Sequence, residues 1–151
     1  VVKISALKKI GLEALMAEIV SRLPESPPFY EQGQLSDRWE RFFASELIRE
    51  QVFALYSEEI PHATAVVIEQ FLEGAGQYKA DLIRATLHVE RDGQKGIILG
   101  KQGKALRELQ ARSLQALECF LGRKVELDLW VKVRHNWRKD ARSLQEFGYA
   151  E

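Results

Sequence analysis

The chain has 151 residues, of which 46% are hydrophobic and 29% charged, and its formal net charge is zero. This length suffices for one ordinary domain, or for one domain with a fragment of another, and the composition is that of a soluble globular protein. No apolar run approaches the length that spans a bilayer, and no signal peptide opens the sequence. The single cysteine, Cys119, excludes an internal disulfide. Its apolar helical surroundings predict a buried side chain, in a protein of the reducing cytoplasm.

Charge is distributed unevenly along the chain. Between Gly93 and Lys139 there are 11 Lys and Arg residues against 4 Asp and Glu, whereas the remainder holds 11 basic and 18 acidic residues. Residues 93–139 therefore carry a net charge of +7, and the rest of the chain carries a net charge of −7. Such asymmetry indicates a basic face that suits a polyanion, although two oppositely charged parts that pair with each other would produce the same numbers.

The N-terminal residues predict one strand and one helix. Val1–Ile4 is the expected strand, a loop runs through Ser5 and Gly11, and apolar residues then recur at helical spacing until Pro24 stops the helix. Glu25–Pro28 has the composition of a linker. Because one strand and one helix cannot close a core, we expect this portion to be the end of a domain that begins further upstream.

The longer C-terminal part predicts an α+β domain. A helix begins near Ser36 or Asp37, either of which can cap it, and ends at Pro61. Two strands, a short helix, a long helix ended by Gly122, a third strand and a last short helix capped by Asn136 follow. The expected ranges are 62–72 and 83–89 for the two strands, 93–99 and 104–121 for the two helices, and 125–133 for the third strand. This order favours helices packed on one face of a three-stranded sheet.

The turn between the two middle helices, Gly100-Lys101-Gln102-Gly103, is the candidate site. Glycine at both ends permits positive φ and the close approach of another backbone. The helix that follows directs its free N–H groups and positive dipole end at the turn, which suits an anion such as phosphate. The candidate contacts with single-stranded RNA are the turn, two neighbours against which bases could lie flat and two nearby cations: Gly96, Ile97, Gly100, Lys101, Gln102, Gly103, Lys104 and Arg107.

Two other phosphate-binding motifs do not fit the spacing of these glycines. A P-loop needs four residues between its glycines, whereas three separate Gly96 from Gly100, and Lys101 is followed by Gln102 in place of Ser or Thr. The dinucleotide motif G-x-G-x-x-G is also absent. A bare G-x-x-G is a weak signal because chance tight turns produce it. Its weight here comes from the apolar residues before it and the basic helix after it, and a fold of this kind that contacts only proteins or a membrane surface stays an open alternative.

Aromatic and basic residues alternate near the end of the third strand and form a second set of candidates. The set consists of Trp130, Lys132, Arg134, Trp137, Arg138 and Lys139. These side chains could stack on RNA bases and neutralise phosphates. Alternatively, the two tryptophans pack together and dock the terminal helix, which is the interpretation we favour for them. We take Arg134, Arg138 and Lys139 as candidate RNA contacts, and no spacing predicts a catalytic set or a metal site.

Several longer stretches resemble those of Era-type GTPases. Val89–Lys104 is similar to the KH signature of that family, and so are four further stretches: Leu121–Val133, Asn136–Arg138, Leu23–Tyr30 and Glu46–Glu50. The similarity covers nearly the whole chain. It implies a type II KH RNA-binding domain at residues 29–151, preceded at residues 1–28 by the last strand and helix of an α/β GTPase domain.

The resemblance also implies a function. Members of the family bind the 3′ end of small-subunit ribosomal RNA, assist maturation of the small ribosomal subunit and associate peripherally with the inner membrane. We therefore expect this RNA and the small subunit as partners, no DNA, and a cytoplasmic location. Ser5-Ala6-Leu7 matches the family loop in which the alanine N–H helps to read guanine. The parent protein is accordingly expected to hydrolyse GTP with Mg²⁺.

The chain departs from the family pattern in two respects. No P-loop, no Mg²⁺-binding Asp loop and no Asn-Lys-x-Asp motif precedes Ser5. We therefore expect this chain neither to hydrolyse GTP nor to bind it tightly, and to need no cofactor of its own. Gln102 stands where the family often has Gly or Glu, a change that leaves the tight turn intact.

Overall fold

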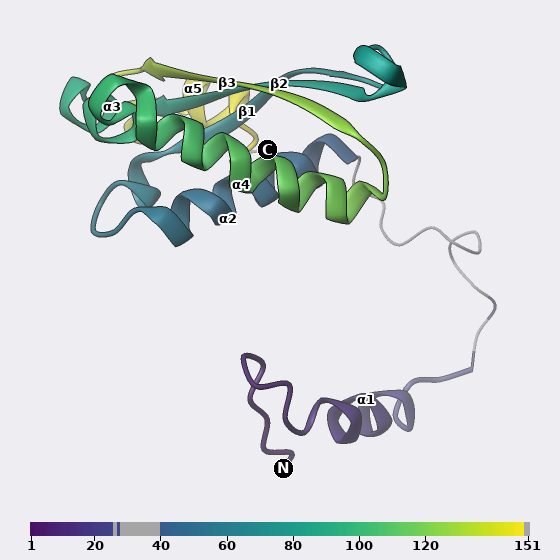
Figure 1. Cartoon of the computed structure of the whole chain (residues 1–151). Helices are drawn as coiled ribbons and strands as arrows, with labels where there is room; N and C mark the ends of the chain where they lie inside the picture. Colours follow the sequence, from purple (N-terminus) through teal and green to yellow (C-terminus); the bar gives the residue numbers. More distant parts are fainter. Residues whose placement is uncertain (26, 28–39, 150–151) are drawn as a thin grey trace. The chain divides into compact units, whose positions relative to one another are not determined.

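The computed structural model describes residues 1–25, 27 and 40–149 (Figure 1). The chain separates into two compact units, Val1–Asp37 and Arg38–Glu151. The predicted domain boundary after Pro28 and the predicted helix start at Ser36 or Asp37 lie outside the described residues, so both stay predictions.

The described residues of the first unit contain one helix, α1 (Leu12–Val20), and no strand. The strand expected at Val1–Ile4 is therefore wrong. A strand needs a neighbour that satisfies its backbone groups, and in this unit Ser5 alone pairs, with Ile10, in an isolated antiparallel bridge of the described residues. The predicted helix is confirmed, and it ends about one turn before Pro24.

Three strands of the second unit form one mixed sheet in the order β1-β2-β3. β1 (Ala65–Leu72) runs antiparallel to β2 (Asp81–Val89), and β3 (Val125–Val133) runs parallel to β2 over its whole length. A parallel neighbour requires a crossover connection, and the two helices between β2 and β3 supply it. β3 thus becomes an edge strand beside these helices, which determines where the candidate site forms (Figure 1).

Three helices build the core with the sheet: α2 (Glu40–Leu55), α3 (Asp92–Leu99) and α4 (Lys104–Leu121). α2 and α4 run side by side beneath one face of the sheet (Figure 1). Strand alternation and helical spacing turn the apolar residues of both layers toward each other. The side chains without exposed surface include Ile48, Val52, Ile83, Leu87, Ile98, Leu109 and Leu117. The expected α+β layer is confirmed, and none of the described helices is long and apolar enough to cross a membrane.

Two element boundaries near Pro61 differ from the prediction. α2 ends at Leu55, six residues before Pro61, and Glu58 between them has a left-handed φ of 57° through which no helix continues. Pro61 begins a short 3₁₀ turn, Pro61–Ala63, and the strand expected from residue 62 starts at Ala65.

The C-terminal segment contacts the opposite face of the sheet. Helix α5 (Ala141–Glu146) begins at Asp140, whose carboxylate accepts a hydrogen bond from the Ser143 N–H at 3.0 Å. The predicted cap at Asn136 is wrong, because that residue precedes a separate 3₁₀ turn and makes no side-chain capping bond. Phe147 then packs on His88 of β2 with ring centroids 4.6 Å apart. His88 is buried for this reason, although strand alternation turns it away from α2 and α4.

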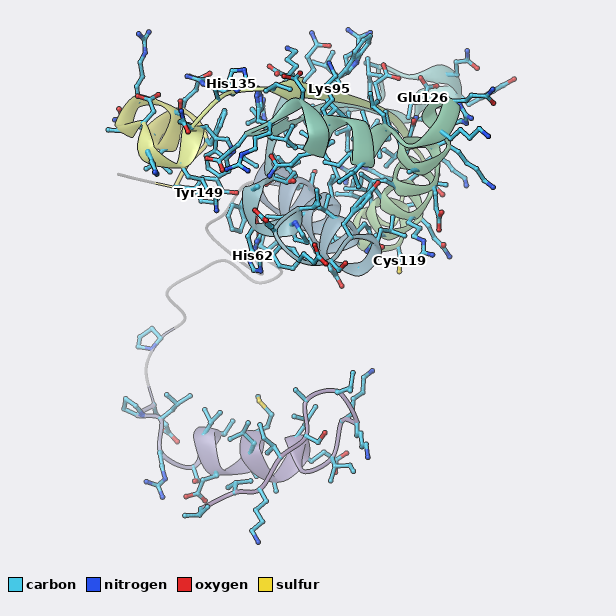
Figure 2. The ribbon with its side chains drawn as sticks, turned by 90° about the vertical axis from the view of Figure 1, so that its left-hand side faces the viewer. His62, Lys95, Cys119, Glu126, His135 and Tyr149 are labelled. Carbon is cyan, nitrogen blue, oxygen red and sulfur yellow. The ribbon has the colours of Figure 1, made fainter. Side chains whose placement is uncertain are left out.

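Cys119 is exposed, and the prediction that it lies in the core is wrong (Figure 2). It follows the buried Leu117 by two positions, which is a rotation of about 200° around α4. Its side chain therefore points away from the face that packs on the sheet.

Candidate nucleic-acid interface

The turn between α3 and α4 has the geometry that its glycines predict. Gly100 and Gly103 have φ values of 66° and 73°, and Gln102 between them has 52°. A Cβ on Gly100 would lie 2.6 Å from the Cβ of Ala105, a contact that real side chains do not make. The glycine thus allows α4 to start directly against the end of α3.

Two backbone N–H groups at the tip of the turn are unused. The Gly100 N–H donates to the Gly96 carbonyl at 2.9 Å, and the Gly103 N–H donates to the Gly100 carbonyl at 3.2 Å. The N–H groups of Lys101 and Gln102 make no hydrogen bond within the described part of the chain. Because free donors at the start of a helix attract anions, a phosphate oxygen fits this tip.

Three cations surround the turn without an ionic partner among the described residues. Lys101, Lys104 and Arg107 are all exposed. The Arg107 Nη1 atom lies 3.3 Å from the position that a Cβ on Gly103 would take, so this guanidinium folds back over the turn. Free donors and unpaired positive charge therefore occur together, as the sequence predicts.

α3 presents a flat surface beside the turn. A Cβ on Gly96 would meet no atom within 4 Å, so the packing of the protein does not require glycine there. Ile97 next to it is 56% exposed. Open space above Gly96 and an exposed apolar side chain are what a base needs to lie flat.

A groove of about 430 Å³ lies between α3, α4 and the edge strand β3. Its apolar part consists of Leu99, Leu106, Leu129, Trp130 and Val131, and its polar part of Lys95, Gln110 and Asp128. Lys95 is labelled on α3 in Figure 2. The groove is therefore lined mainly by apolar side chains, with one cation on the helix side.

Most of these groove residues are missing from the prediction. Lys95 with Leu99, and Leu106 with Gln110, are each four positions apart on one helix, a spacing that places both members of a pair on the same face. This local signal was available in the sequence. The meeting of those two faces with β3 follows from the crossover connection and has no local signal.

The hydrogen-bonding pattern of β3 shows which backbone groups face outward. In a parallel ladder, the backbone groups of alternate residues point to the neighbouring strand. The Lys124 carbonyl accepts from the Asp81 N–H and the Arg134 N–H donates to the Val89 carbonyl, each at 2.8 Å. Even-numbered residues of β3 therefore face β2, and odd-numbered residues face the outer edge.

α4 satisfies the outward groups at the start of β3 and leaves those further along open. Gln110 donates to the Leu127 carbonyl at 2.5 Å, and Glu118 accepts from the Val125 N–H at 3.3 Å. The outward N–H and carbonyl groups of Leu129 and Val131 face the groove without a partner among the described residues. They can serve the polar edges of bases as donors and acceptors.

The basic residues that follow β3 are engaged within the protein. Arg134 forms an ion pair with Glu146 at 2.8 Å and lies over the Phe147 ring at 5.1 Å. Arg138 donates a hydrogen bond to the buried Glu90 carboxylate, which raises the pKa of Arg138 and holds the pKa of Glu90 below its ordinary value. Lys139 is exposed. None of these three predicted contacts lines the groove, and their contact with RNA stays a prediction.

The two tryptophans have different environments. Trp137 is 4% exposed, donates from Nε1 to the Ala63 carbonyl at 3.0 Å and packs edge-on against Phe147 at 5.4 Å. The packing interpretation is therefore confirmed for Trp137. Trp130 is 63% exposed and makes no ring contact with Trp137, so the joint packing of both is wrong.

Ser5, Ala6 and Leu7 form a tight loop in the first unit. The Ser5 N–H donates to the Ile10 carbonyl at 3.0 Å, and the Ala6 carbonyl accepts from the Lys9 N–H at 3.2 Å. The Ala6 N–H has no hydrogen-bond partner among the described residues. Its role toward guanine stays a prediction.

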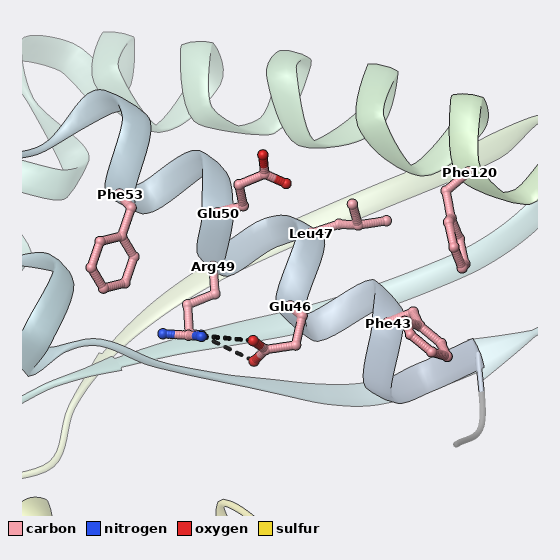
Figure 3. A pocket seen from close by; sticks show the side chains of 7 residues that line it. All are labelled: Phe43, Glu46, Leu47, Arg49, Glu50, Phe53 and Phe120. Carbon is pink, nitrogen blue, oxygen red and sulfur yellow. Dashed lines mark hydrogen bonds and ion pairs between the residues drawn. The ribbon is translucent and has the colours of Figure 1, made fainter. Parts of the chain in front are cut away.

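A second hollow, of about 460 Å³, lies on α2 and the end of α4 (Figure 3). Phe43, Leu47, Phe53 and Phe120 line it together with Glu46, Arg49 and Glu50. Glu46 accepts hydrogen bonds from Arg49, whereas Glu50 has no ionic partner among the described residues and leaves the hollow with a net negative charge. Apolar rings and a free carboxylate do not suit a phosphate chain, so this hollow is no candidate for nucleic acid.

Comparison with known proteins agrees with the geometry. A family model described as "KH domain" matches residues 59–138, a span that contains all three strands, α3, the turn and α4. The chain belongs to the KH domain family. The expected KH fold is confirmed, and the turn just described is the G-x-x-G loop of this KH domain.

Relatives extend the similarity beyond the KH domain. GTPase Era of Lactobacillus helveticus is 49% identical over 149 residues, which is 99% of this chain and 49% of that protein. GTPase Era of Carboxydothermus hydrogenoformans is 43% identical over 148 residues, with coverage of 98% and 49%. The resemblance to Era-type GTPases is therefore confirmed, and the chain spans about half the length of the curated relatives it matches.

Two solved structures share the fold. One is a variant of Era from Aquifex aeolicus bound to GDP·AlF4⁻, and the other is Era in complex with MgGDPNP and nucleotides 1506–1542 of 16S ribosomal RNA. Each matches with a TM-score of 0.89 and 38% identity, over 98% of this chain and 49% of the solved chain.

Proposed function

We propose that this chain is the RNA-binding half of an Era-type GTPase, and that its KH domain binds single-stranded RNA of the small ribosomal subunit. The observation that carries the proposal is the G-x-x-G turn, where the N–H groups of Lys101 and Gln102 and three nearby cations have no partner among the described residues. The solved Era complex with 16S ribosomal RNA supports this class of ligand.

The binding mode follows from the chemistry of the interface. Phosphates lie at the turn, where Lys101, Lys104 and Arg107 neutralise them. Bases lie on the surface of Gly96 and Ile97 and in the groove. Their polar edges bond to the open backbone groups of β3. A G-x-x-G loop of this kind holds about four nucleotides.

We further propose that the RNA segment is the 3′ end of the small-subunit ribosomal RNA, that binding assists subunit maturation, and that the complete protein hydrolyses GTP with Mg²⁺. The support is the likeness to proteins named GTPase Era and to solved forms that hold GDP·AlF4⁻ or MgGDPNP. GTP hydrolysis by the complete protein, and its absence in the 151-residue chain, would test the enzymatic part.

The location is a separate proposal. We place the protein in the cytoplasm with peripheral attachment to the inner membrane, and the family resemblance is its support. Fractionation of cells that carry the complete protein, with and without a high-salt wash of the membranes, would test it. Recovery of the protein only after detergent extraction would contradict peripheral attachment.

The RNA proposal is tested by the double substitution Lys101→Asp with Gln102→Asp. The change places carboxylates where phosphate is expected, and Asp tolerates the left-handed φ of position 102, so the fold should survive. Affinity for 16S nucleotides 1506–1542 should fall at least about tenfold in a filter-binding or anisotropy titration. Gln77→Asp with Lys79→Asp, the same change of charge in the turn between β1 and β2, is the matched control.

Two outcomes contradict the proposal. Wild-type affinity in the Lys101–Gln102 variant would exclude the turn as the RNA site. Equal losses in this variant and in the control would indicate a general effect of charge. In either case, a KH fold used for protein or membrane-surface contacts becomes the better explanation, and vesicle binding would test it. Affinity should also fall with added salt, by a log–log slope of about 0.7 for each phosphate contacted.

A further inference from the structure

Packing within the protein does not explain why residue 130 is a tryptophan. The odd-numbered side chains of β3 are buried against the helices, so the even-numbered Trp130 stands on the opposite face of the sheet. This face is open at Trp130, and Phe147 covers it at His88 of β2. It is 63% exposed, and among the described residues it makes no contact with another ring. Tryptophan is enriched at interfaces because it combines a large apolar ring with an N–H donor, so Trp130 is a candidate contact.

The open face around Trp130 is hollowed. A depression of about 460 Å³ is lined by one residue pair from each strand: Glu69, Gln70, Arg84, Thr86, Trp130 and Lys132. Register pairs Thr86 with Trp130 directly, which places the floor of the depression beside the indole. Most of the residues that line the depression are polar or charged.

Among the described residues, two charged groups of this depression have no ionic partner: Glu69 on β1 and Lys132 on β3, and Lys132 is the one on the same strand as the indole. Arg84 is neutralised by Asp128 at 3.4 Å and donates to Gln70 at 3.0 Å. Lys132 is exposed and has no ionic partner among the described residues. It lies two residues from Trp130 on the same face of the strand, a separation of about 7 Å. This distance suits a base on the ring with its phosphate at the ammonium group.

Trp130 also lines the KH groove on the other side of the same edge strand. It is the one described residue that the groove and the sheet-face depression have in common. The two surfaces are therefore continuous around the edge of β3.

We propose that a single-stranded RNA that fills the KH groove continues around the edge of β3 onto the open sheet face, where a base stacks on Trp130 and a phosphate meets Lys132. This inference rests on the proposed function, because the strand must first occupy the groove. It adds a stacking site outside the G-x-x-G surface, on the face of the sheet that turns away from α3 and α4.

The test compares a long and a short RNA on the 151-residue chain. The long RNA is 16S nucleotides 1506–1542, and the short one is whichever four-nucleotide piece of it binds the wild type most tightly. Trp130→Ala should weaken binding of the long RNA about 5- to 150-fold, the range that the loss of one stacked base produces, and should affect the short RNA much less. Trp130→Phe should retain part of the effect, and Lys132→Gln should weaken binding of the long RNA alone.

Tryptophan fluorescence gives an independent readout, because Trp130 is exposed and Trp137 is buried. The substitution of Trp130 separates its signal from that of the other two tryptophans of the chain. The long RNA should quench the emission of the wild type, and the quenching should be lost in Trp130→Phe. Tyr78→Ala, which removes a 99% exposed ring from the turn between β1 and β2, is the control and should bind both RNAs as the wild type does.

Equal losses for both RNAs would overturn the inference, since Trp130 would then act only as a wall of the groove. Wild-type affinity of Trp130→Ala for both would overturn it as well, and would assign the face to another kind of partner. Neither result affects the proposed function, which is tested separately by Lys101→Asp with Gln102→Asp and its matched control.

Discussion

At position 100 the chain requires glycine for two reasons that act together. The backbone has φ 66° and ψ −179°, a combination that residues with a side chain avoid, and a Cβ would collide with Ala105. At position 96 neither reason applies, because the space around a Cβ is empty. The two glycines look alike in the sequence, and the structure assigns one to the fold and the other to the binding surface.

We expect Gly100→Ala to destabilise the protein by about 2 kcal/mol or more, because backbone strain and overlap with Ala105 add to each other. Urea unfolding followed by circular dichroism would measure the loss. A free energy of unfolding within 0.5 kcal/mol of the wild type would show that the turn relaxes at no cost, which contradicts the steric argument.

Gly96→Ala, in contrast to Gly100→Ala, should weaken RNA binding without destabilising the protein. Alanine in the interior of α3 should leave the stability unchanged or raise it by about 0.5–1 kcal/mol. RNA affinity should fall, because the new methyl group occupies the space in which a base would lie. The same unfolding experiment together with an RNA titration would check both parts. Unchanged affinity would exclude close approach of RNA at this position.

At the scale of elements, α2 supports the helix that carries the turn. The Tyr56 hydroxyl, just after α2, donates to the Ile98 carbonyl at 3.2 Å, in the last turn of α3. Burial raises the pKa of Tyr56, so the hydroxyl keeps its proton. Carbonyls at a helix end need such partners, because no further turn of the helix supplies them. This contact joins two elements that the turn itself does not connect.

Tyr56→Phe should therefore lower the free energy of unfolding by about 0.5–1.5 kcal/mol, the net value of one hydrogen bond, with little change in packing. Chemical unfolding would measure it. Tyr78→Phe removes a hydroxyl from a fully exposed ring and should have no effect. Equal effects of the two substitutions would argue against a specific support of α3.

At the scale of the whole molecule, two buried groups make the stability depend on pH. Burial lowers the pKa of His88, and Lys132 and Arg134 lower it further, against the opposing effect of Glu69 and Glu146. At the end of the same strand, the hydrogen bond from Arg138 lowers the pKa of Glu90. Both pKa values lie below those of the unfolded chain. The unfolded chain therefore binds more protons in acid, and stability falls as the pH falls.

The contribution of His88 should be complete above the ordinary histidine pKa of about 6.5 and should be lost as the pH falls through the lower folded value. The contribution of Glu90 to the unfolding free energy should be lost as the pH falls below about 4.3, the ordinary pKa of glutamate. His88→Gln should therefore flatten the decline of the unfolding free energy just below about pH 6.5, where one proton accounts for at most about 1.4 kcal/mol per pH unit. Urea unfolding at a series of pH values would measure the slopes. An identical slope in both proteins would contradict the role of His88.

The sequence by itself determined the features that depend on residues a few positions apart. The glycine spacing predicts the turn, the alternation in 125–133 predicts β3, and the spacing of Leu109 and Leu117 predicts the buried face of α4. Each follows from the period of one element, and the structure confirms each. The strand at Val1–Ile4 failed because a strand also needs a partner, and its own residues do not specify one.

Only the tertiary structure decided which elements meet. The crossover from β2 through α3 and α4 makes β3 an edge strand, and this creates the groove and turns the backbone of Leu129 and Val131 into it. Arg138, a predicted RNA contact, meets Glu90 instead, 48 positions away in the chain. Local periodicity specifies the face that an element buries, but not the neighbour that covers it, because that choice depends on packing between segments far apart in sequence.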